Sequence, residues 1–338
     1  MKAAVFTAPG VIEYNLNYPD PQNEDGIVLQ TKACGICGTD IKALAGNRPG
    51  MEPPMILGHE FSGFVIESKI DAFKVGDRVS AAPYAGCGIC DSCLNNHEEL
   101  CKNKIFSPAG CFAERVAIPA NLAQKTGWKI PMNVSWDEAA MAEPLACVIL
   151  SLRSCHWEPG WSILIVGGGF MGLLHIAVAK AWGANKILVS EPNAIRRSTA
   201  ESMGAITFDP QTGGDLKEWS FKNTDGRGPN VVVTPIAIPE VVESAIECAA
   251  PGGFVHVFGG LPKTAKLSVS AYSIHYKEIS LLGTSGFRTT DYRMAAEMIA
   301  NKKIDLSNLI SQRFTLEETS EAFKSAKDQN NLKIIINP

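Results

Sequence analysis

The sequence of 338 residues has no run of about 18 apolar residues, so it contains no candidate for a membrane-spanning helix. Its first residues, "MKAAVFTAPGVIEY", lack the apolar core and cleavage site of a signal peptide. It also lacks a basic excess, because 31 Lys and Arg against 35 Asp and Glu give a net charge of -4. These absences predict a cytoplasmic protein with no membrane partner and no nucleic-acid partner.

The composition, with 46 % hydrophobic and 20 % charged residues, is typical of a globular protein, and the length predicts two domains. Ten cysteines in a reducing compartment are not expected to form a disulfide framework, so their clustering calls for a metal or redox explanation. The tetrapeptide Cys-Gly-Ile-Cys occurs twice, at 34–37 and at 87–90. The two copies therefore need separate interpretations.

The chain divides into two parts with different patterns of apolar residues. Residues 1–145 contain short apolar runs such as "GIVLQTKAC" separated by turn signals, which predict an antiparallel β domain. From Trp161 onwards, short β-branched strands alternate with helical periods, which predicts a parallel sheet covered by helices over 146–285. Two more helical patterns and the strand "LKIIIN" in 286–338 are expected to return to the first domain.

The second Cys-Gly-Ile-Cys belongs to a group of four cysteines spaced by two, two and seven residues: Cys87, Cys90, Cys93 and Cys101. Four thiolates can close a tetrahedral shell around Zn²⁺ and leave no position for a substrate, so we expect a structural zinc site. The alternatives are an iron-sulfur cluster and four unrelated buried cysteines.

The first Cys-Gly-Ile-Cys has no further cysteine pair nearby. Instead, "LGHEFSG" supplies His59 and Glu60, and "AEPLACV" supplies Glu143. Cys37, His59 and a carboxylate would form a three-ligand zinc site with an open fourth position. From spacing alone, the alternatives are an ordinary polar pair at His59 and a helix N-terminal carboxylate at Glu143.

The segment "ILIVGGGFMGLLH" carries a Gly-x-Gly-x-x-Gly motif between a strand and a helix, formed by Gly167, Gly169 and Gly172. Such glycines let the backbone approach a pyrophosphate at the helix N-terminus. Glu191 ends the next strand, where a carboxylate accepts ribose hydroxyls and repels a 2′-phosphate, so NAD is favoured over NADP. Arg196 and Arg197 favour NADP, and a turn without a ligand is the remaining alternative.

Together these segments resemble the zinc-containing medium-chain dehydrogenases, in the branch with sorbitol and threonine dehydrogenases. The resemblance covers essentially the whole chain through "CGICGTD", "GHEFSG", "FKVGDRV", the four cysteines, "CFAERV", "AEPLACV", "GGGFMG" and "LISQRFTLEE". It implies an α/β protein with a GroES-like β-barrel catalytic domain and a Rossmann doubly wound parallel-sheet domain. It also implies NAD and two zinc ions per chain.

The resemblance further implies roles for individual residues. Cys37 and His59 match ligands of the catalytic zinc, with Glu60 and Glu143 nearby as alternate or water-mediated ligands, whereas Cys34 matches a position that is not a ligand. Thr39 matches the hydroxyl that starts a proton relay. The matched cofactor and substrate contacts are Phe170, Met171, Arg196, Phe287 and Arg288.

Three features depart from the family pattern. Lys42 stands where many relatives carry a histidine that passes the proton to solvent. Ala43 and Thr289 replace aromatic residues that sorbitol dehydrogenase places around its substrate, which puts sorbitol itself in doubt. The segment "VVVTPIAIPE" lacks the acidic residue and the glycine usual after that strand.

We therefore expect a homodimeric or homotetrameric enzyme that reversibly oxidises a secondary hydroxyl of a polyol, sugar or cyclitol by hydride transfer to NAD. The alternatives are a threonine-type or simple alcohol dehydrogenase, a sugar-phosphate dehydrogenase suggested by Lys42 and Arg288, and a catalytically silent NAD-binding module. The sequence leaves open the physiological substrate, the reaction direction and whether Glu60 or Glu143 is the resting carboxylate ligand.

Overall fold

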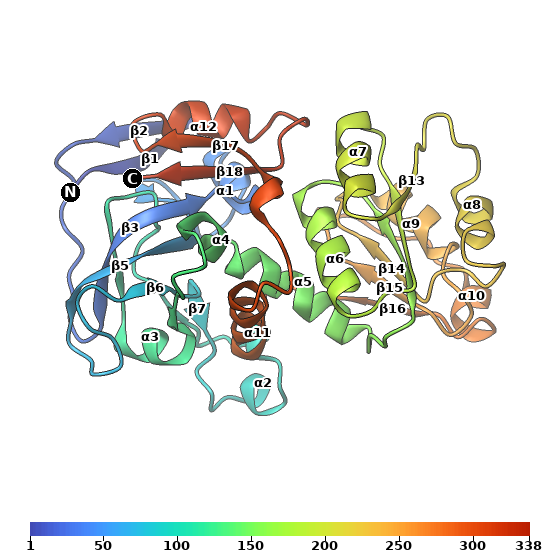
Figure 1. Cartoon of the computed structure of the whole chain (residues 1–338), viewed down its shortest axis with the longest axis horizontal. Helices are drawn as coiled ribbons and strands as arrows, with labels where there is room; N and C mark the ends of the chain where they lie inside the picture. Colours follow the sequence, from blue (N-terminus) through green and yellow to red (C-terminus); the bar gives the residue numbers. More distant parts are fainter. The chain divides into compact units, whose positions relative to one another are not determined.

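The computed structural model describes all 338 residues. It divides into two compact units, here called unit 1 (Met1–Ala146 with Phe287–Pro338) and unit 2 (Cys147–Gly286). In Figure 1 unit 1 contains both the blue and the red ends of the chain. The sequence predicts one domain made of 1–145 with 286–338 and a second domain made of 146–285. These domain boundaries remain a prediction.

Unit 1 is built from mainly antiparallel sheets. Its largest sheet has the order β10-β6-β5-β3-β18-β17, with β9 also paired to β3, and smaller sheets are formed by β2-β1-β4 and by β7-β8. The strands are β1 (Ala3–Ala8), β2 (Val11–Asn15), β3 (Ile27–Gly35), β4 (Met55–Ile56), β5 (Glu60–Ser68), β6 (Arg78–Ser80), β7 (Tyr84–Ala85), β8 (Ile105–Phe106), β9 (Arg115–Ile118), β10 (Trp128–Lys129), β17 (Ile310–Thr315) and β18 (Lys333–Asn337). The C-terminal strand thus lies inside the sheet formed by the first part of the chain.

Apart from α11, the helices of unit 1 are short. They are α1 (Gly38–Leu44), α2 (Asp91–Leu94), the 3-10 turn η1 (Glu98–Leu100), α3 (Ala120–Thr126), α4 (Trp136–Ala140), α11 (Thr289–Ala300), the 3-10 turn η2 (Ser307–Leu309) and α12 (Thr319–Ser325). The boundary between the units falls within α5 (Ala142–Ser154). None of the helices combines the length and the apolar character needed to cross a membrane.

The pairing of three strands sets the position of the first Cys-Gly-Ile-Cys. Strand β3 pairs antiparallel with β5 so that Gly35 faces Glu60, and β18 pairs antiparallel with β3 on its other side. Buried apolar side chains of β3 and β5, among them Leu29 and Phe61, belong to one core. Because β3 ends where β5 begins, Cys37 is brought beside the start of β5.

Unit 2 contains a six-stranded parallel sheet with the order β13-β12-β11-β14-β15-β16. The strands are β11 (Ser162–Val166), β12 (Lys186–Ser190), β13 (Ile206–Phe208), β14 (Val231–Thr234), β15 (Phe254–Val257) and β16 (Ser280–Gly283). The helices are α6 (Phe170–Ala181), α7 (Ala194–Ser202), α8 (Leu216–Lys222), α9 (Pro239–Ile246) and α10 (Ala271–His275). Every residue of β11 is buried, as expected for a central strand of a covered sheet.

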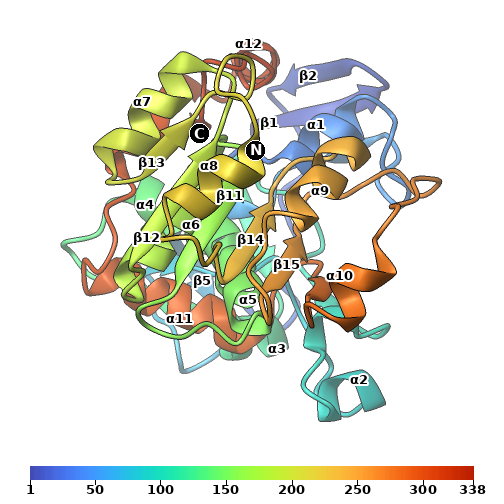
Figure 2. The same ribbon diagram turned by 90° about the vertical axis from the view of Figure 1, so that its right-hand side faces the viewer.

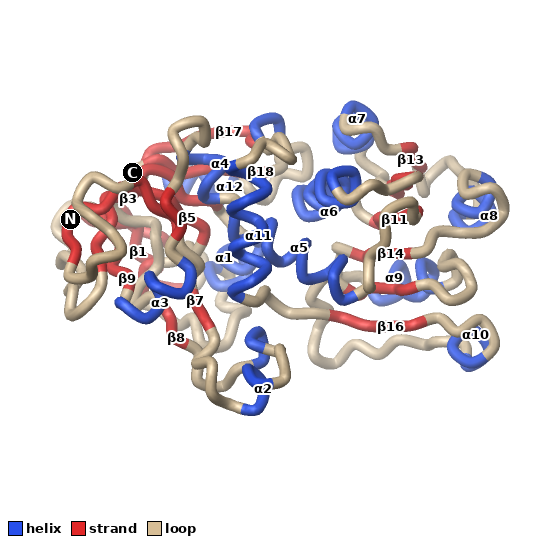
Figure 3. The backbone as a smooth tube through the Cα atoms, turned by 60° about the horizontal axis from the view of Figure 1, so that its bottom comes forward, coloured by secondary structure: helices blue, strands red, loops and turns tan.

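Helices lie on both faces of this sheet. In Figure 1, α6 and α7 lie on one side of the strands and α8 and α9 on the other, and Figure 3 shows the regular alternation of strand and helix along this part of the chain. The predicted α/β class with a doubly wound parallel sheet is confirmed.

Candidate active site and metal centres

Three potential metal ligands meet where β3 ends and β5 begins. One side-chain donor atom from each of Cys37, His59 and Glu60 lies within 4.8 Å of the other two. Cys37 is the N-cap of α1, and its Sγ accepts a hydrogen bond from the backbone N–H of Thr39 at 3.5 Å. A thiol, an imidazole and a carboxylate are a donor set that suits Zn²⁺.

Asp40 contacts both Cys37 and His59 and holds them in place, although it was not among the predicted site residues. Its buried carboxylate accepts hydrogen bonds from the backbone N–H groups of Cys37 at 2.9 Å and Gly58 at 3.0 Å, and Oδ1 lies 3.4 Å from Nδ1 of His59. A carboxylate at Nδ1 orients the imidazole so that Nε2 is available to a metal. The spacing Cys-x-x-Asp at a helix start was the signal that could have identified Asp40.

The electrostatics of the site favour positive charge. Burial opposes protonation of His59, but the neighbouring Asp40 and Cys37 raise its pKa well above the ordinary value of 6.5. A site that stabilises an imidazolium in this way would also stabilise a cation that replaces the proton.

Glu60 is fully buried and forms an ion pair with Lys333 on β18. The Lys333 Nζ lies 2.5 Å from Glu60 Oε2 and also donates to the carbonyl of Ile36 at 3.1 Å. Glu60 Oε1 is buried and has no hydrogen-bond partner. Gly35 is required beside this pair because a Cβ at that position would overlap Glu60 Oε2. An unsatisfied buried carboxylate oxygen next to a thiol and an imidazole fits a metal ligand.

Glu143 lies in the first turn of α5 and is largely buried. It is not one of the three residues whose donor atoms are mutually close. Burial raises the pKa of Glu143 to about 7, with the charges of His59 and Glu60 acting in opposite directions. The structure thus groups Cys37, His59 and Glu60, and it places Glu143 within electrostatic reach of them.

The four remaining predicted ligands form a second group, on the loop that carries α2 and η1. Their four sulfur atoms lie within 4.8 Å of one another, with 3.9 Å between Cys87 and Cys93 and 3.7 Å between Cys90 and Cys101. An S–S distance of about 3.8 Å is the edge of a tetrahedron with Zn–S bonds of about 2.3 Å. The geometry therefore fits a closed four-thiolate zinc site.

The protonation of these thiols is uneven. The backbone N–H groups of Ile89 and Cys90 lower the pKa of Cys87 to about 6. Burial and the neighbouring thiols raise the pKa of Cys93 to about 12. Four sulfurs this close repel one another as thiolates, and a divalent cation would relieve that repulsion.

Cys34 has a different environment from Cys37, although both belong to the first tetrapeptide. Its side chain is fully buried, and its Sγ donates to the carbonyl oxygen of Cys111 at 2.8 Å. Cys34 packs in the core of unit 1 and is absent from the group of close ligand atoms.

The glycine motif of unit 2 joins β11 to α6. Gly167 has φ of +122°, Gly169 is the N-cap of α6, and a Cβ on Gly172 would overlap the Gly167 carbonyl oxygen. Phe170 and Met171 form the first turn of the helix and are partly exposed. These features leave backbone N–H groups at a helix N-terminus, which suits a pyrophosphate.

Glu191 is buried beside this loop. Its Oε2 accepts from Gly168 N–H at 2.7 Å and its Oε1 from Asn193 N–H at 2.8 Å. Arg197 forms an ion pair with Asp209 at 2.9 Å. Arg196 lies closer to the loop, since a Cβ on Gly169 would be 3.5 Å from its Nη1.

Phe287 and Arg288 lie in unit 1, at the start of α11. Phe287 is buried and stacks on Tyr84 with 4.6 Å between ring centroids. Arg288 forms an ion pair with Glu99, a partner that no local sequence pattern predicted.

Comparison with known proteins identifies the family. Residues 23–128 match the alcohol dehydrogenase GroES-like domain, and residues 171–301 match the zinc-binding dehydrogenase domain. The chain is 31 % identical to sorbitol dehydrogenase of Bacillus subtilis, over 100 % of its own length and 97 % of the relative. The chain belongs to the zinc-binding dehydrogenases. It is an alcohol or polyol dehydrogenase that uses zinc and a nicotinamide cofactor.

Other members of the zinc-binding dehydrogenases show the same coverage. L-threonine 3-dehydrogenase of Thermococcus kodakarensis is 30 % identical over 100 % of this chain and 98 % of the relative. The NADP-bound structure of a zinc-binding dehydrogenase from Sinorhizobium meliloti superposes with a TM-score of 0.91 at 30 % identity, covering 100 % and 99 % of the two chains. The predicted family, GroES-like domain and enzyme class are confirmed.

Proposed function

We propose that this zinc-binding dehydrogenase oxidises a secondary hydroxyl of a polyol, sugar or cyclitol with NAD, and catalyses the reverse reduction. The observation that carries the proposal is the group of close ligand atoms from Cys37, His59 and Glu60. In this group the buried Oε1 of Glu60 has no hydrogen-bond partner. The sorbitol dehydrogenase relative supports the substrate class. The group offers three protein ligands, the number typical of a catalytic zinc site, and this supports a fourth position that is open to a substrate hydroxyl.

In this proposal Cys37 and His59 hold the catalytic zinc, together with Glu60 or Glu143. When bound there, zinc supplies Lewis acidity that lowers the pKa of the substrate hydroxyl. Thr39 Oγ1 would relay the proton that the substrate hydroxyl loses: it accepts that proton while it passes its own hydroxyl proton onward toward solvent, so that the side chain stays neutral. Lys42 lies exposed in the last turn of the same helix, where it could influence the exit of that proton.

Other residues of the site act by holding these groups in place. Asp40 orients His59, and Lys333 neutralises Glu60 and restricts its movement. A second zinc ion, held by the four thiolates, has no open position and would stabilise the loop around α2.

The preference for NAD over NADP is also a proposal. The carboxylate of Glu191 lies at the glycine loop, where it would repel a 2′-phosphate. Arg197 is engaged by Asp209 and by the carbonyl oxygens of Glu191 and Pro192, so it is poorly placed to receive that phosphate. A relative has been solved with NADP bound, so the cofactor preference of this protein needs a direct test. Its kcat/KM should be at least about tenfold higher with NAD than with NADP.

The second candidate function is a threonine-type dehydrogenase, which the relative from Thermococcus kodakarensis supports. The sugar-phosphate alternative loses support because Glu99 offsets the positive charge of Arg288 that would attract a phosphate, although the Nη groups of Arg288 keep their capacity to donate hydrogen bonds to a neutral hydroxyl. The silent module also loses support, since Cys37, His59 and Glu60 are present and lie together. A screen of polyols, inositols, sugar phosphates, threonine and simple alcohols with NAD tests the proposal, and activity on simple alcohols alone would contradict it.

We propose a homodimer or homotetramer in a cytoplasmic location. Strand β16 is an edge of the unit 2 sheet, and its residues are largely exposed. Tyr272, Tyr276 and Leu281 add exposed apolar surface nearby, which would be unfavourable in a monomer. The free thiols of both sites require a reducing compartment. Sedimentation analysis should give a dimer or a tetramer, and a monomer would contradict the proposed oligomeric state.

A further inference from the structure

The loop that carries the four cysteines is linked to the start of α11 by two adjacent carboxylates. Glu98 and Glu99 are the first two residues of η1, between the third and fourth cysteines of the group. In Figures 1, 2 and 3 the loop with α2 projects away from the large sheet of unit 1. A projecting loop with few core contacts depends on such local links for a fixed position.

Glu98 binds the first residue of α11. Its Oε2 accepts from the backbone N–H of Thr289 at 2.7 Å, and its Oε1 accepts from the Thr289 hydroxyl at 3.0 Å. A carboxylate at this end of a helix is also favoured by the helix dipole. A Cβ on Gly86 would lie 2.7 Å from Glu98 Cγ and 2.9 Å from Cys93 Sγ, so Glu98 and the cysteine group are closely packed.

Glu99 binds the preceding residue. Its Oε2 accepts from Nε of Arg288 at 3.0 Å, with exposures of only 5 % for Glu99 and 14 % for Arg288. His97 Nδ1 lies 3.0 Å from the other carboxylate oxygen. Because the ion pair uses Nε, the Nη groups of Arg288 stay available to a ligand.

Phe287 is held in the same region. The Tyr84 hydroxyl accepts from Phe287 N–H at 2.9 Å and donates to the Phe287 carbonyl at 3.1 Å, while the two rings stack. Three consecutive residues, 287–289, are thus fixed by the four-cysteine loop and the strand that precedes it.

We propose that Glu98 and Glu99 are positioning residues for the segment 287–289, and that the metal-closed cysteine loop sets the orientation of the Arg288 guanidinium toward the substrate. This inference rests on the proposed function for the zinc of the loop and for the contact made by Arg288. Neither carboxylate touches a reacting atom, so both act through residues 288 and 289.

Hydrogen exchange tests the structural part without any measurement of activity. The variant Glu98→Gln/Glu99→Gln should exchange the amides of 286–292 about tenfold faster than the wild type, while the amides of β3 stay unchanged. Cys93→Ser, which removes one thiol of the loop, should accelerate the same segment. Unchanged exchange in 286–292 in both variants would overturn the proposal, as would equal acceleration throughout unit 1.

Kinetics test the action through Arg288. Glu99→Gln and Arg288→Gln should each raise the KM for the polyol by about tenfold with kcat within about twofold, and the double variant should be no worse than Arg288→Gln alone. Asp137→Asn is a matched control, because Asp137 pairs with Nε of Arg313 at 2.7 Å elsewhere in unit 1. It should leave the KM within about twofold.

The outcomes separate this inference from the proposed function. If the wild type binds two zinc ions and turns over a polyol, but the effects of Glu99→Gln and Arg288→Gln multiply, then the positioning role is wrong. If the wild type shows no NAD-dependent turnover of any alcohol while 286–292 responds as expected, then the proposed substrate chemistry is wrong and the structural link holds.

Discussion

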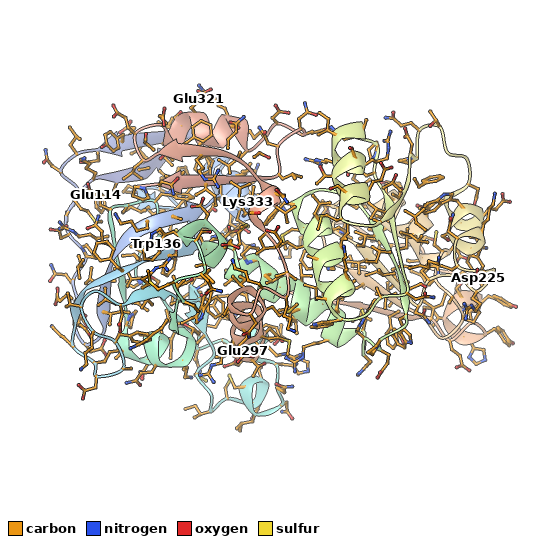
Figure 4. The ribbon with its side chains drawn as sticks, viewed as in Figure 1. Glu114, Trp136, Asp225, Glu297, Glu321 and Lys333 are labelled. Atoms are coloured by element: carbon orange, nitrogen blue, oxygen red, sulfur yellow. The ribbon has the colours of Figure 1, made fainter.

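The buried ion pair between Lys333 and Glu60 gives the sharpest prediction on stability. Lys333→Met keeps most of the side-chain volume and removes the charge that faces Glu60 Oε2. Glu60 is fully buried and Lys333 is 2 % exposed, so water cannot replace the ammonium group. Figure 4 labels Lys333 on β18 within unit 1.

The expected loss is about 3–5 kcal/mol, the usual result of leaving one partner of a buried pair uncompensated. This is a large part of the about 5–15 kcal/mol that stabilises an ordinary domain. A second change, Glu60→Gln, should restore part of the stability because it removes the orphaned charge. Added zinc should also reduce the loss, since a cation at Glu60 compensates the same charge.

The assay is urea-dependent hydrogen exchange in β3 and β5, which reports on unit 1 by itself. Lys324→Met is the matched control: its partner Glu321 lies 3.2 Å away, but the two side chains are 72 % and 64 % exposed. This control should cost less than about 1 kcal/mol. Equal losses for Lys333→Met and Lys324→Met would refute the reasoning.

Two further predictions concern unit 2. Burial lowers the pKa of His175 to about 3 and the pKa of His256 to about 4. Below about pH 6.5 the unfolded state therefore binds more protons than the folded state. The free energy of unfolding should fall as the pH drops from about 6.5 to 4, by up to about 1.4 kcal/mol per pH unit for each histidine. Acid denaturation of His175→Asn and His256→Asn should show shallower slopes, and wild-type slopes would contradict this account. Gly172→Ala forces a Cβ against the Gly167 carbonyl oxygen, so it should weaken NADH binding by at least about tenfold in a fluorescence titration, and unchanged affinity would contradict the role of the loop.

Local sequence patterns predicted the parts of the molecule that depend on local chemistry. The alternation of strands and helices predicted the parallel sheet of unit 2, because each element there is short and regular. The spacing of the four cysteines placed them in one loop, and the structure brings their sulfur atoms together.

Long-range partners could not be predicted in the same way. Lys333 is separated from Glu60 by 273 positions, and their contact depends on how β18 pairs with β3. The link from Glu99 to Arg288 likewise spans 189 positions. Periodicity identifies which residues share a face of one element, but it does not identify which elements meet.

The central claim is that the two Cys-Gly-Ile-Cys segments have different roles, and zinc analysis of cysteine variants tests it most directly. The wild type and Cys34→Ser should each bind two zinc ions per chain and remain active. Cys37→Ser should keep only the zinc of the four-cysteine loop and lose activity. Loss of a zinc ion in Cys34→Ser, with two zinc ions and full activity retained in Cys37→Ser, would contradict the account.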